Sequence, residues 1–477
     1  MSSLVERLRG VIRPPSAGPG RPEADGVSFR ERHVPDGEYM DARPGPGDAA
    51  EILDGEWQER RGQRFLVVDR KYSPGYRLGK VTVADGLPPA DGMWARLPLL
   101  AGTSCSGRML FVDLETTGLA GGAGSYAFLV GCGWFESGTF RVRQFFLSTF
   151  AGERALLEAV RETADSAGTI VTYNGKSFDL PLMETRFLLH RMDTPFAGRP
   201  HVDMLHPARR LWQQGRSRAH DDARRESSHA RFADDVTGYQ RTGAGRPSAE
   251  ASTERGRGGP AGDCRLSTLE NALCGHEREG DVAGFEIPSR YFHYVRSGDA
   301  SALAPVLEHN RLDLLALALV TARAAQLLED GADAARTAHE ALGMGRLYER
   351  AGLDAEARAA FERSAILPGA DIVTRAEGLR ACAVLLRRQR RHDDAAAAWR
   401  RILELRGAPP NITREATDAL AVHHEHRLRD PRSARTFALE SMRLTQTVAR
   451  KEAVQHRLAR LNRKLADAHA PTLFTSL

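Results

Sequence analysis

Two carboxylates stand one residue apart on a segment, Met109–Leu114, that is otherwise predicted to be a buried strand. Side chains alternate across a strand, so Asp113 and Glu115 point to the same face, about 7 Å apart along the chain. Unpaired carboxylates on a core strand cost several kcal/mol unless something compensates them. A divalent metal ion is one compensation and makes the pair a reaction centre. On spacing alone, a strand end with two solvated acids is an equal alternative.

Length, charge and cysteine usage set the broad class of the chain. Its 477 residues are too many for one ordinary core and predict two or three domains. A formal charge of +5 permits nucleic acid as a partner without requiring it. Five scattered cysteines form no Cys-x-x-Cys pair, which argues against a zinc site and indicates a reducing compartment. Without a signal-peptide pattern or a long apolar run, we expect a cytoplasmic protein with no membrane contact.

Composition divides the chain into segments. Residues 1–50 are rich in Pro, Gly and charge and are predicted to be a flexible N-terminal segment. Residues 51–100 carry weak strand signals and are predicted to be a small accessory β region. Residues 101–332 form the main α/β domain. Within it, residues 214–263 are predicted to be a disordered insertion, with an arginine-rich nucleic-acid arm as the less favoured alternative. Residues 333–477 are predicted to be helical.

The α/β part has a distinctive order of elements. Strands are predicted at 108–114, 126–135, 140–148 and 169–173, with helices at 153–164, 180–191, 203–213 and 301–328. Short turns between the first three strands favour antiparallel pairing. Three antiparallel strands followed by alternating helices and strands is the order of a ribonuclease-H-like fold, with a mixed sheet.

The C-terminal part contains an internal repeat. The segment Ala357–Phe361 is echoed by Ala395–Trp399 and, more loosely, by Ala434–Ala438, at offsets of 38 and 39 residues. This is near the period of helix-pair solenoids, and the first unit resembles a tetratricopeptide repeat. An irregular helical domain is the alternative. Residues 448–468 are predicted to be the capping helix.

Two further acidic motifs are weak when each is taken alone. Asp179 follows an Asn-Gly turn and begins a helix, where an Asp also acts as a cap. His309 and Asp313 are four residues apart, so they lie on one helical face, which also fits a plain surface pair.

Together, the order D-x-E, N-x3-F-D and H-x3-D resembles the DEDD family of ribonuclease-H-like 3′→5′ exonucleases. More specifically it resembles the YprB-like branch, in which such a domain is joined to tetratricopeptide repeats. The resemblance covers roughly residues 100–330, without the insertion, and loosely the helical tail. It implies hydrolysis of phosphodiester bonds in single-stranded DNA or RNA, with a possible protein partner on the helical repeats.

The resemblance also implies roles for individual residues. Two Mg²⁺ or Mn²⁺ ions would be held by four carboxylates, Asp113, Glu115, Asp179 and Asp313. The ions would activate water and stabilise charge on the leaving oxygen, and His309 would orient or deprotonate the water. Tyrosine-type members place Tyr four residues before the last Asp, and histidine-type members place His five before it. This chain has His at the tyrosine-type spacing, so the role of His309 as the base is left open.

Secondary candidates for substrate binding lie in turns. They are Thr116, Thr117, Leu119, Asn174 and Lys176, and ordinary turn chemistry is the alternative for each group. For Asp203 we expect helix capping rather than catalysis. For His201 and His206 we expect packing or surface roles.

Two other functions remain open. In one, the chain is a nucleic-acid-binding interaction protein with weak or no nuclease activity, whose helical repeats bind the partner. In the other, the same metal site serves a structure-specific endonuclease.

Overall fold

The computed structural model describes residues 48–87, 93–118, 124–213, 263–445 and 447–467. The N-terminal segment 1–47 and residues 214–262 lie outside them, so the expectations for a flexible N-terminus and a disordered insertion stay predictions.

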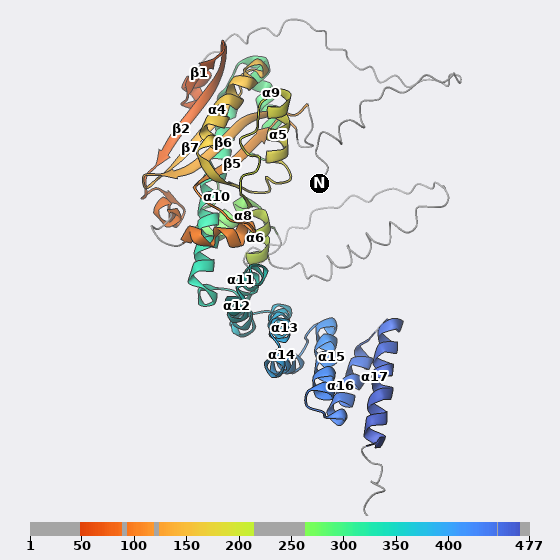
Figure 1. Ribbon diagram of the computed structural model, residues 1–477. Coiled ribbons are helices and arrows are strands. Elements are labelled where there is room, and N and C mark those ends of the chain that lie inside the picture. Colours follow the sequence, from red (N-terminus) through yellow and green to blue (C-terminus); the bar gives the residue numbers. More distant parts are fainter. Residues whose placement is uncertain (1–47, 88–92, 119–123, 214–262, 446, 468–477) are drawn as a thin grey trace, which may run out of the picture. The chain divides into compact units, whose positions relative to one another are not determined.

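A seven-stranded sheet forms the centre of the described α/β part (Figure 1). Its spatial order is β1-β2-β7-β6-β5-β8-β9. The strands are β1 (Glu56–Arg60), β2 (Gln63–Tyr72), β5 (Arg108–Thr116), β6 (Ala127–Glu136), β7 (Thr139–Phe146), β8 (Ala167–Thr172) and β9 (His201–Asp203). Strands β5, β6 and β7 pair antiparallel, while β8 runs parallel to both β5 and β9. The predicted mixed sheet is therefore confirmed.

The region 51–100 differs from the expected small accessory unit. Strand β2 pairs antiparallel with β7 along seven residues, from Leu66 to Tyr72, and β1 adds the outer edge. Buried Phe65, Leu66 and Val68 join the main core. Two two-residue strands, β3 (Arg77–Leu78) and β4 (Val81–Thr82), form a separate small sheet. The pairing of β2 with β7 joins residues between 68 and 80 positions apart, which local strand signals cannot reveal.

Helices cover both faces of the sheet. Helices α4 (Glu153–Asp165), α5 (Asp179–Leu189) and α9 (Ile287–Ser297) pack on the face that carries Leu110 and Val112. On the other face, which carries Phe111, lie α6 (Leu205–Leu211), α8 (Leu266–Leu269) and the long α10 (Ala304–Asp330). The alternation along β5 thus sorts its side chains between two separate helix layers.

The C-terminal part is helical, as expected. Its helices are α11 (Ala338–Arg350), α12 (Asp354–Ile366), α13 (Ile372–Arg388), α14 (His392–Glu404), α15 (Pro410–His426), α16 (Pro431–Leu444) and α17 (Val448–Asp467). The three repeated segments begin at equivalent places, in α12, α14 and α16. Phe361 and Trp399 are buried, and a methyl group at Gly345 would lie 2.4 Å from the Phe361 ring. The repeat therefore marks the second helix of successive pairs, while its assignment to the tetratricopeptide class stays a prediction.

Among the described helices, none is both long and apolar enough to cross a lipid bilayer.

Candidate active site

Strand β5 carries two carboxylates that face the helix layer containing α10. Asp113 and Glu115 alternate with the buried Val112 and Leu114, so they share the face of Phe111. A shift of register between Glu115 and Thr116 ends the regular pairing with β6 directly after the second acid. Such irregularities re-aim side chains at strand ends, and here the irregularity follows the acidic pair.

A series of hydrogen bonds between two buried side-chain amides, here called the amide relay, holds Asp113 against α10. Asn310, fully buried, donates from Nδ2 to Asp113 Oδ2 at 2.7 Å. Its Oδ1 accepts from Gln144 Nε2 on β7 at 2.9 Å, and the same Gln144 nitrogen donates to the Leu307 carbonyl at 2.7 Å. Three elements are therefore joined through one hydrogen-bonded path that ends on the first carboxylate.

Gly131 makes room for this relay. It lies opposite Asp113 in the β5–β6 register, and a methyl group there would lie 2.3 Å from Asn310 Oδ1 and 2.8 Å from Leu314 Cδ1. We expect Gly131→Ala to lower the free energy of unfolding by about 1–3 kcal/mol, because α10 must move from the sheet. Urea unfolding measures this. Gly75→Ala is the control, since its methyl meets no atom within 4 Å; equal stability of both variants would contradict the close contact.

Asp179 is the first residue of α5 and follows the predicted turn. Asn174 adopts a left-handed conformation with φ of 68°. Asp203, at the end of β9, accepts from the Asn174 and Lys176 backbone nitrogens at 2.7 and 3.1 Å and from Leu205 N at 3.1 Å. Asp203 therefore holds the turn before α5 and the start of α6. The expected helix capping differs in detail, because the N-cap of α6 is Met204.

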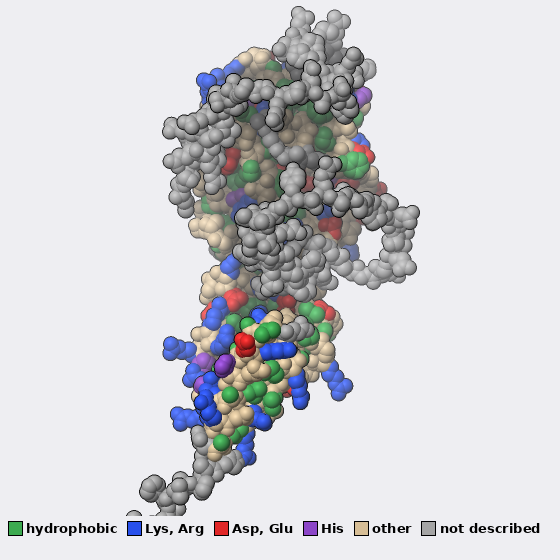
Figure 2. Space-filling view, turned by 90° about the vertical axis from the view of Figure 1, so that its right-hand side faces the viewer, with side chains coloured by type: hydrophobic (Ala, Val, Ile, Leu, Met, Phe, Trp, Pro, Cys, Tyr) green, Lys and Arg blue, Asp and Glu red, His purple; other side chains and the backbone are tan. Residues whose placement is uncertain are grey.

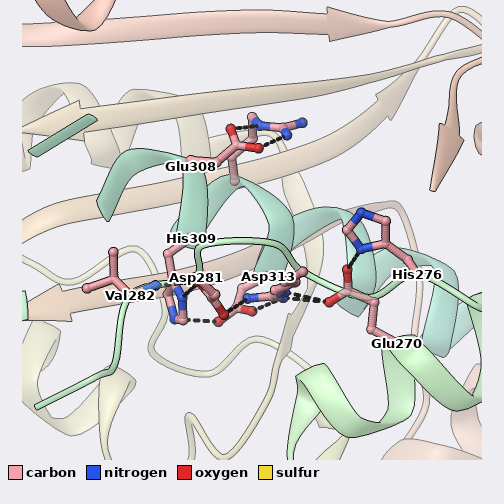
Figure 3. A network of polar contacts seen from close by, with 9 residues as sticks. Glu270, His276, Asp281, Val282, Glu308, His309 and Asp313 are labelled. Carbon is pink, nitrogen blue, oxygen red and sulfur yellow. Dashed lines mark hydrogen bonds and ion pairs between the residues drawn. The ribbon is translucent and has the colours of Figure 1, made fainter. Parts of the chain in front are cut away.

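The fourth carboxylate belongs to a network of charged side chains (Figure 3). Asp313 Oδ1 accepts from Arg278 Nη2 at 2.5 Å, and Asp313 Oδ2 lies 3.6 Å from His309 Nε2. His309 Nδ1 lies 2.6 Å from Asp281 Oδ1. The shared helical face predicted for His309 and Asp313 is thus present, and Asp281 adds a carboxylate that the sequence motifs did not indicate.

Burial and mutual repulsion raise the pKa values of three of the four acids. Burial, followed by Asp313, Glu115 and Asp179, raises the pKa of Asp113 well above its usual value, although the Asn310 hydrogen bond opposes this. The pKa of Glu115 is raised by burial and then by Asp313, Asp179 and Asp281. For Asp179, burial and then Asp203 and Asp313 raise the pKa to about 7. For Asp113, Glu115 and Asp179, burial and the neighbouring acids therefore outweigh any favourable interaction with the ionised form.

A cavity of about 560 Å³ opens beside Asp313 and His309. Basic and polar groups share its wall, among them Arg209, Arg265, Arg278 and Asn174. Of the four acids, only Asp313 lines this cavity. A cavity with several convergent polar groups is typical of a binding site.

Two of the remaining substrate-binding candidates, Thr116 and Thr117, form local hydrogen bonds. Thr116 Oγ1 donates to the Gly118 carbonyl at 3.0 Å, and Thr117 Oγ1 accepts from Tyr126 N at 2.9 Å. Lys176 is exposed. His201 Nε2 lies 2.8 Å from Thr172 Oγ1, a packing contact. Leu119 lies outside the described residues, so its proposed contact stays a prediction.

Comparisons with known proteins agree with this architecture. Residues 110–241 and 252–325 match the model of the RNase_H superfamily. This part of the chain therefore has a ribonuclease-H-like fold, and the predicted fold class is confirmed. The chain is also similar to the uncharacterized protein YprB of Bacillus subtilis (strain 168). The two are 25% identical over 409 residues, which cover 84% of this chain and 86% of YprB.

Proposed function

We propose that the chain is a metal-dependent 3′→5′ exonuclease that hydrolyses phosphodiester bonds in single-stranded DNA or RNA. The observation that carries the proposal is the convergence of four carboxylates from β5, α5 and α10, three of which have pKa values raised by burial and by one another. Ribonuclease-H-like proteins generally use divalent metals. Clustered carboxylates suit such hard cations.

The donor set fits two Mg²⁺ or Mn²⁺ ions in its chemistry. Asp113, Glu115, Asp179 and Asp313 would hold them. Bound there, the ions would polarise the phosphodiester and lower the pKa of the attacking water. Among the described residues, no group of three or more His, Cys, Asp or Glu side chains is arranged to hold an ion. We therefore expect the four carboxylates to change rotamers and move closer together when metal ions bind.

The protein's own groups supply orientation around the reacting phosphate. Asn310 fixes the Asp113 carboxylate by hydrogen bonding, and Asp281 holds the Nδ1 side of His309. His309 Nε2 is thereby turned toward Asp313 and the cavity, where it is positioned to accept a proton from water. Arg209 and Arg265 on the cavity wall suit the phosphates of the bound strand.

Digestion of a 5′-labelled oligonucleotide tests the proposal. We expect a ladder of shortened products with Mn²⁺ or Mg²⁺, and none with EDTA, on DNA, on RNA or on both. No metal-dependent shortening of either substrate would refute the proposal. Cleavage of a circular single strand would instead indicate an endonuclease on the same site.

The His309–Asp281 pair leads to a separate prediction. We expect His309→Ala to lower kcat about a hundredfold at pH 7, because a positioned proton acceptor is lost. Metal affinity should change little. Steady-state kinetics and Mn²⁺ titration measure the two effects, with exposed His293→Ala on α9 as the control. Wild-type kcat in the His309 variant would assign water activation to another group.

A nucleic-acid-binding interaction protein is the second candidate function. Two observations favour it: no described group is arranged to hold an ion, and Arg278 already pairs with Asp313. In addition, Lys and Arg side chains are spread over the exposed surface of the helical part, where a partner would bind (Figure 2). Thermal unfolding with Mn²⁺ separates the two functions. An unchanged Tm at millimolar Mn²⁺ would favour this candidate.

A further inference from the structure

Arg278 occupies a central place among the acids of the site. Its side chain is only 5% exposed. Nη2 lies 2.5 Å from Asp313 Oδ1 and 2.6 Å from Glu270 Oε2, while Nη1 lies 3.3 Å from Asp281 Oδ2. One guanidinium therefore serves three carboxylates, and its planar set of donors suits this bridging.

Glu270 is a second carboxylate that anchors the guanidinium. The Glu270 side chain is fully buried and also lies 2.5 Å from His276 Nδ1 (Figure 3). It comes from a short π-helical turn, Glu270–Cys274, next to α8. A buried carboxylate is costly without a cationic partner, so Glu270 and Arg278 hold one another in place.

Asp313 differs from the other three acids of the cluster. Within the part of the chain that the structure describes, Arg278 is the only Lys or Arg that forms an ion pair with any of Asp113, Glu115, Asp179 and Asp313. The second oxygen of Asp313 faces His309 Nε2. One oxygen of Asp313 thus already has a cationic partner, whereas Asp113 meets a neutral amide.

We propose that Arg278 is a built-in counter-ion that competes with divalent cations for Asp313, so that Arg278 and its anchor Glu270 together set the metal affinity of the site. The inference rests on the proposed metal dependence and adds a means of tuning it. A cation bound at Asp313 must share this carboxylate with the guanidinium or displace it. The two positive charges also repel one another at short range in a poorly solvated site.

The arrangement gives opposite effects for two neutralising substitutions. Arg278→Gln removes the competing charge, so divalent cations should bind more tightly. Glu270→Gln removes the anchor charge and leaves Arg278 to rely on Asp313 and Asp281, so the cations should bind more weakly. A merely structural role for the pair would shift both variants in the same direction.

The experiment is calorimetric titration of the full chain with Mn²⁺, and with Ca²⁺ as a second probe, at pH 7.5. We expect the Kd of Arg278→Gln to fall about tenfold and that of Glu270→Gln to rise several-fold. Arg290→Gln on α9 is the matched control, since Arg290 pairs with Glu286 and with none of the four acids. Thermal unfolding in EDTA checks that each variant is folded.

An unchanged or weaker affinity in folded Arg278→Gln would overturn the inference. If Arg278→Gln does not fold, the inference is tested with Glu270→Gln. An unchanged or tighter affinity of that variant for Mn²⁺ would also overturn the inference. Failure of the wild-type chain to bind either cation would refute the proposed metal dependence itself, which separates the two failures.

Discussion

Asp113→Asn should abolish metal-dependent hydrolysis while making the metal-free protein more stable. The amide keeps the shape of the side chain, and its oxygen can still accept from Asn310 Nδ2. It cannot supply the negative charge that a divalent cation requires. We expect kcat to fall about a thousandfold or more. The metal-free Tm should rise, because one charge leaves a cluster in which burial and like charges raise the pKa of Asp113.

Two measurements test this pair of effects, oligonucleotide digestion with Mn²⁺ and thermal unfolding in EDTA. Asp165→Asn is the matched control. Asp165 ends α4 and its side chain is 60% exposed. It precedes β8, whose first residue pairs with Arg108 at the end of β5 that lies away from Asp113 and Glu115. Both activity and Tm of this variant should therefore stay near wild type. Activity retained in Asp113→Asn would mean that the observed nuclease works from another site or is a contaminant.

The stability of the metal-free protein should fall as the pH rises through the range in which Asp179 titrates. Its folded pKa, about 7, lies above the ordinary value of 3.8. Between these values the folded protein holds a proton that the unfolded chain releases, so raising the pH favours unfolding. The stabilisation of the protonated folded form is fully present below about pH 4 and is lost as the pH approaches 7. The loss at pH 8 amounts to roughly 3–5 kcal/mol for this group.

Asp179→Asn isolates this contribution. The difference in free energy of unfolding between the variant and the wild type should grow from pH 4 to pH 7 and then level off. Denaturant unfolding in EDTA across this range measures it. In the wild type, Mn²⁺ should raise the Tm more at pH 8 than at pH 5.5, because cation binding at low pH must first displace protons. A difference that does not vary with pH would show that Asp179 titrates normally.

Part of the site followed from sequence patterns because it depends on local periodicity. The two-residue spacing of Asp113 and Glu115 places them on one face of a strand, and the four-residue spacing of His309 and Asp313 places them on one face of a helix. Asn310 carried a usable signal: it lies three residues before Asp313, hence on the same face of α10. Its importance was missed because a lone Asn next to a His has no distinctive pattern.

Other parts could not be predicted from local patterns. Arg278 and Asp281 lie in a loop without periodicity, and only the packing of that loop against α10 brings them to Asp313. Likewise, β9 has three residues, too few for a strand signal, and the predicted helix at 203–213 begins at Leu205 instead. Contacts between distant segments decide each of these features, which is why spacing along the chain did not reveal them.

Helix α10 has a consequence for how the chain can be divided. One hydrophobic core runs from Phe111 in the sheet through α10 to Phe361 in α12 and Leu385 in α13. Trp212, just after α6, donates to Glu340 in α11 at 2.9 Å, and Tyr348 donates to the Leu328 carbonyl at 2.6 Å. A chain shortened after residue 332 would therefore leave a large apolar surface in water and tend to aggregate. A cut after α14 would divide only the smaller cluster that joins α13 and α14 to α15. Activity and solubility are therefore best sought together in a fragment that keeps the first two helix pairs.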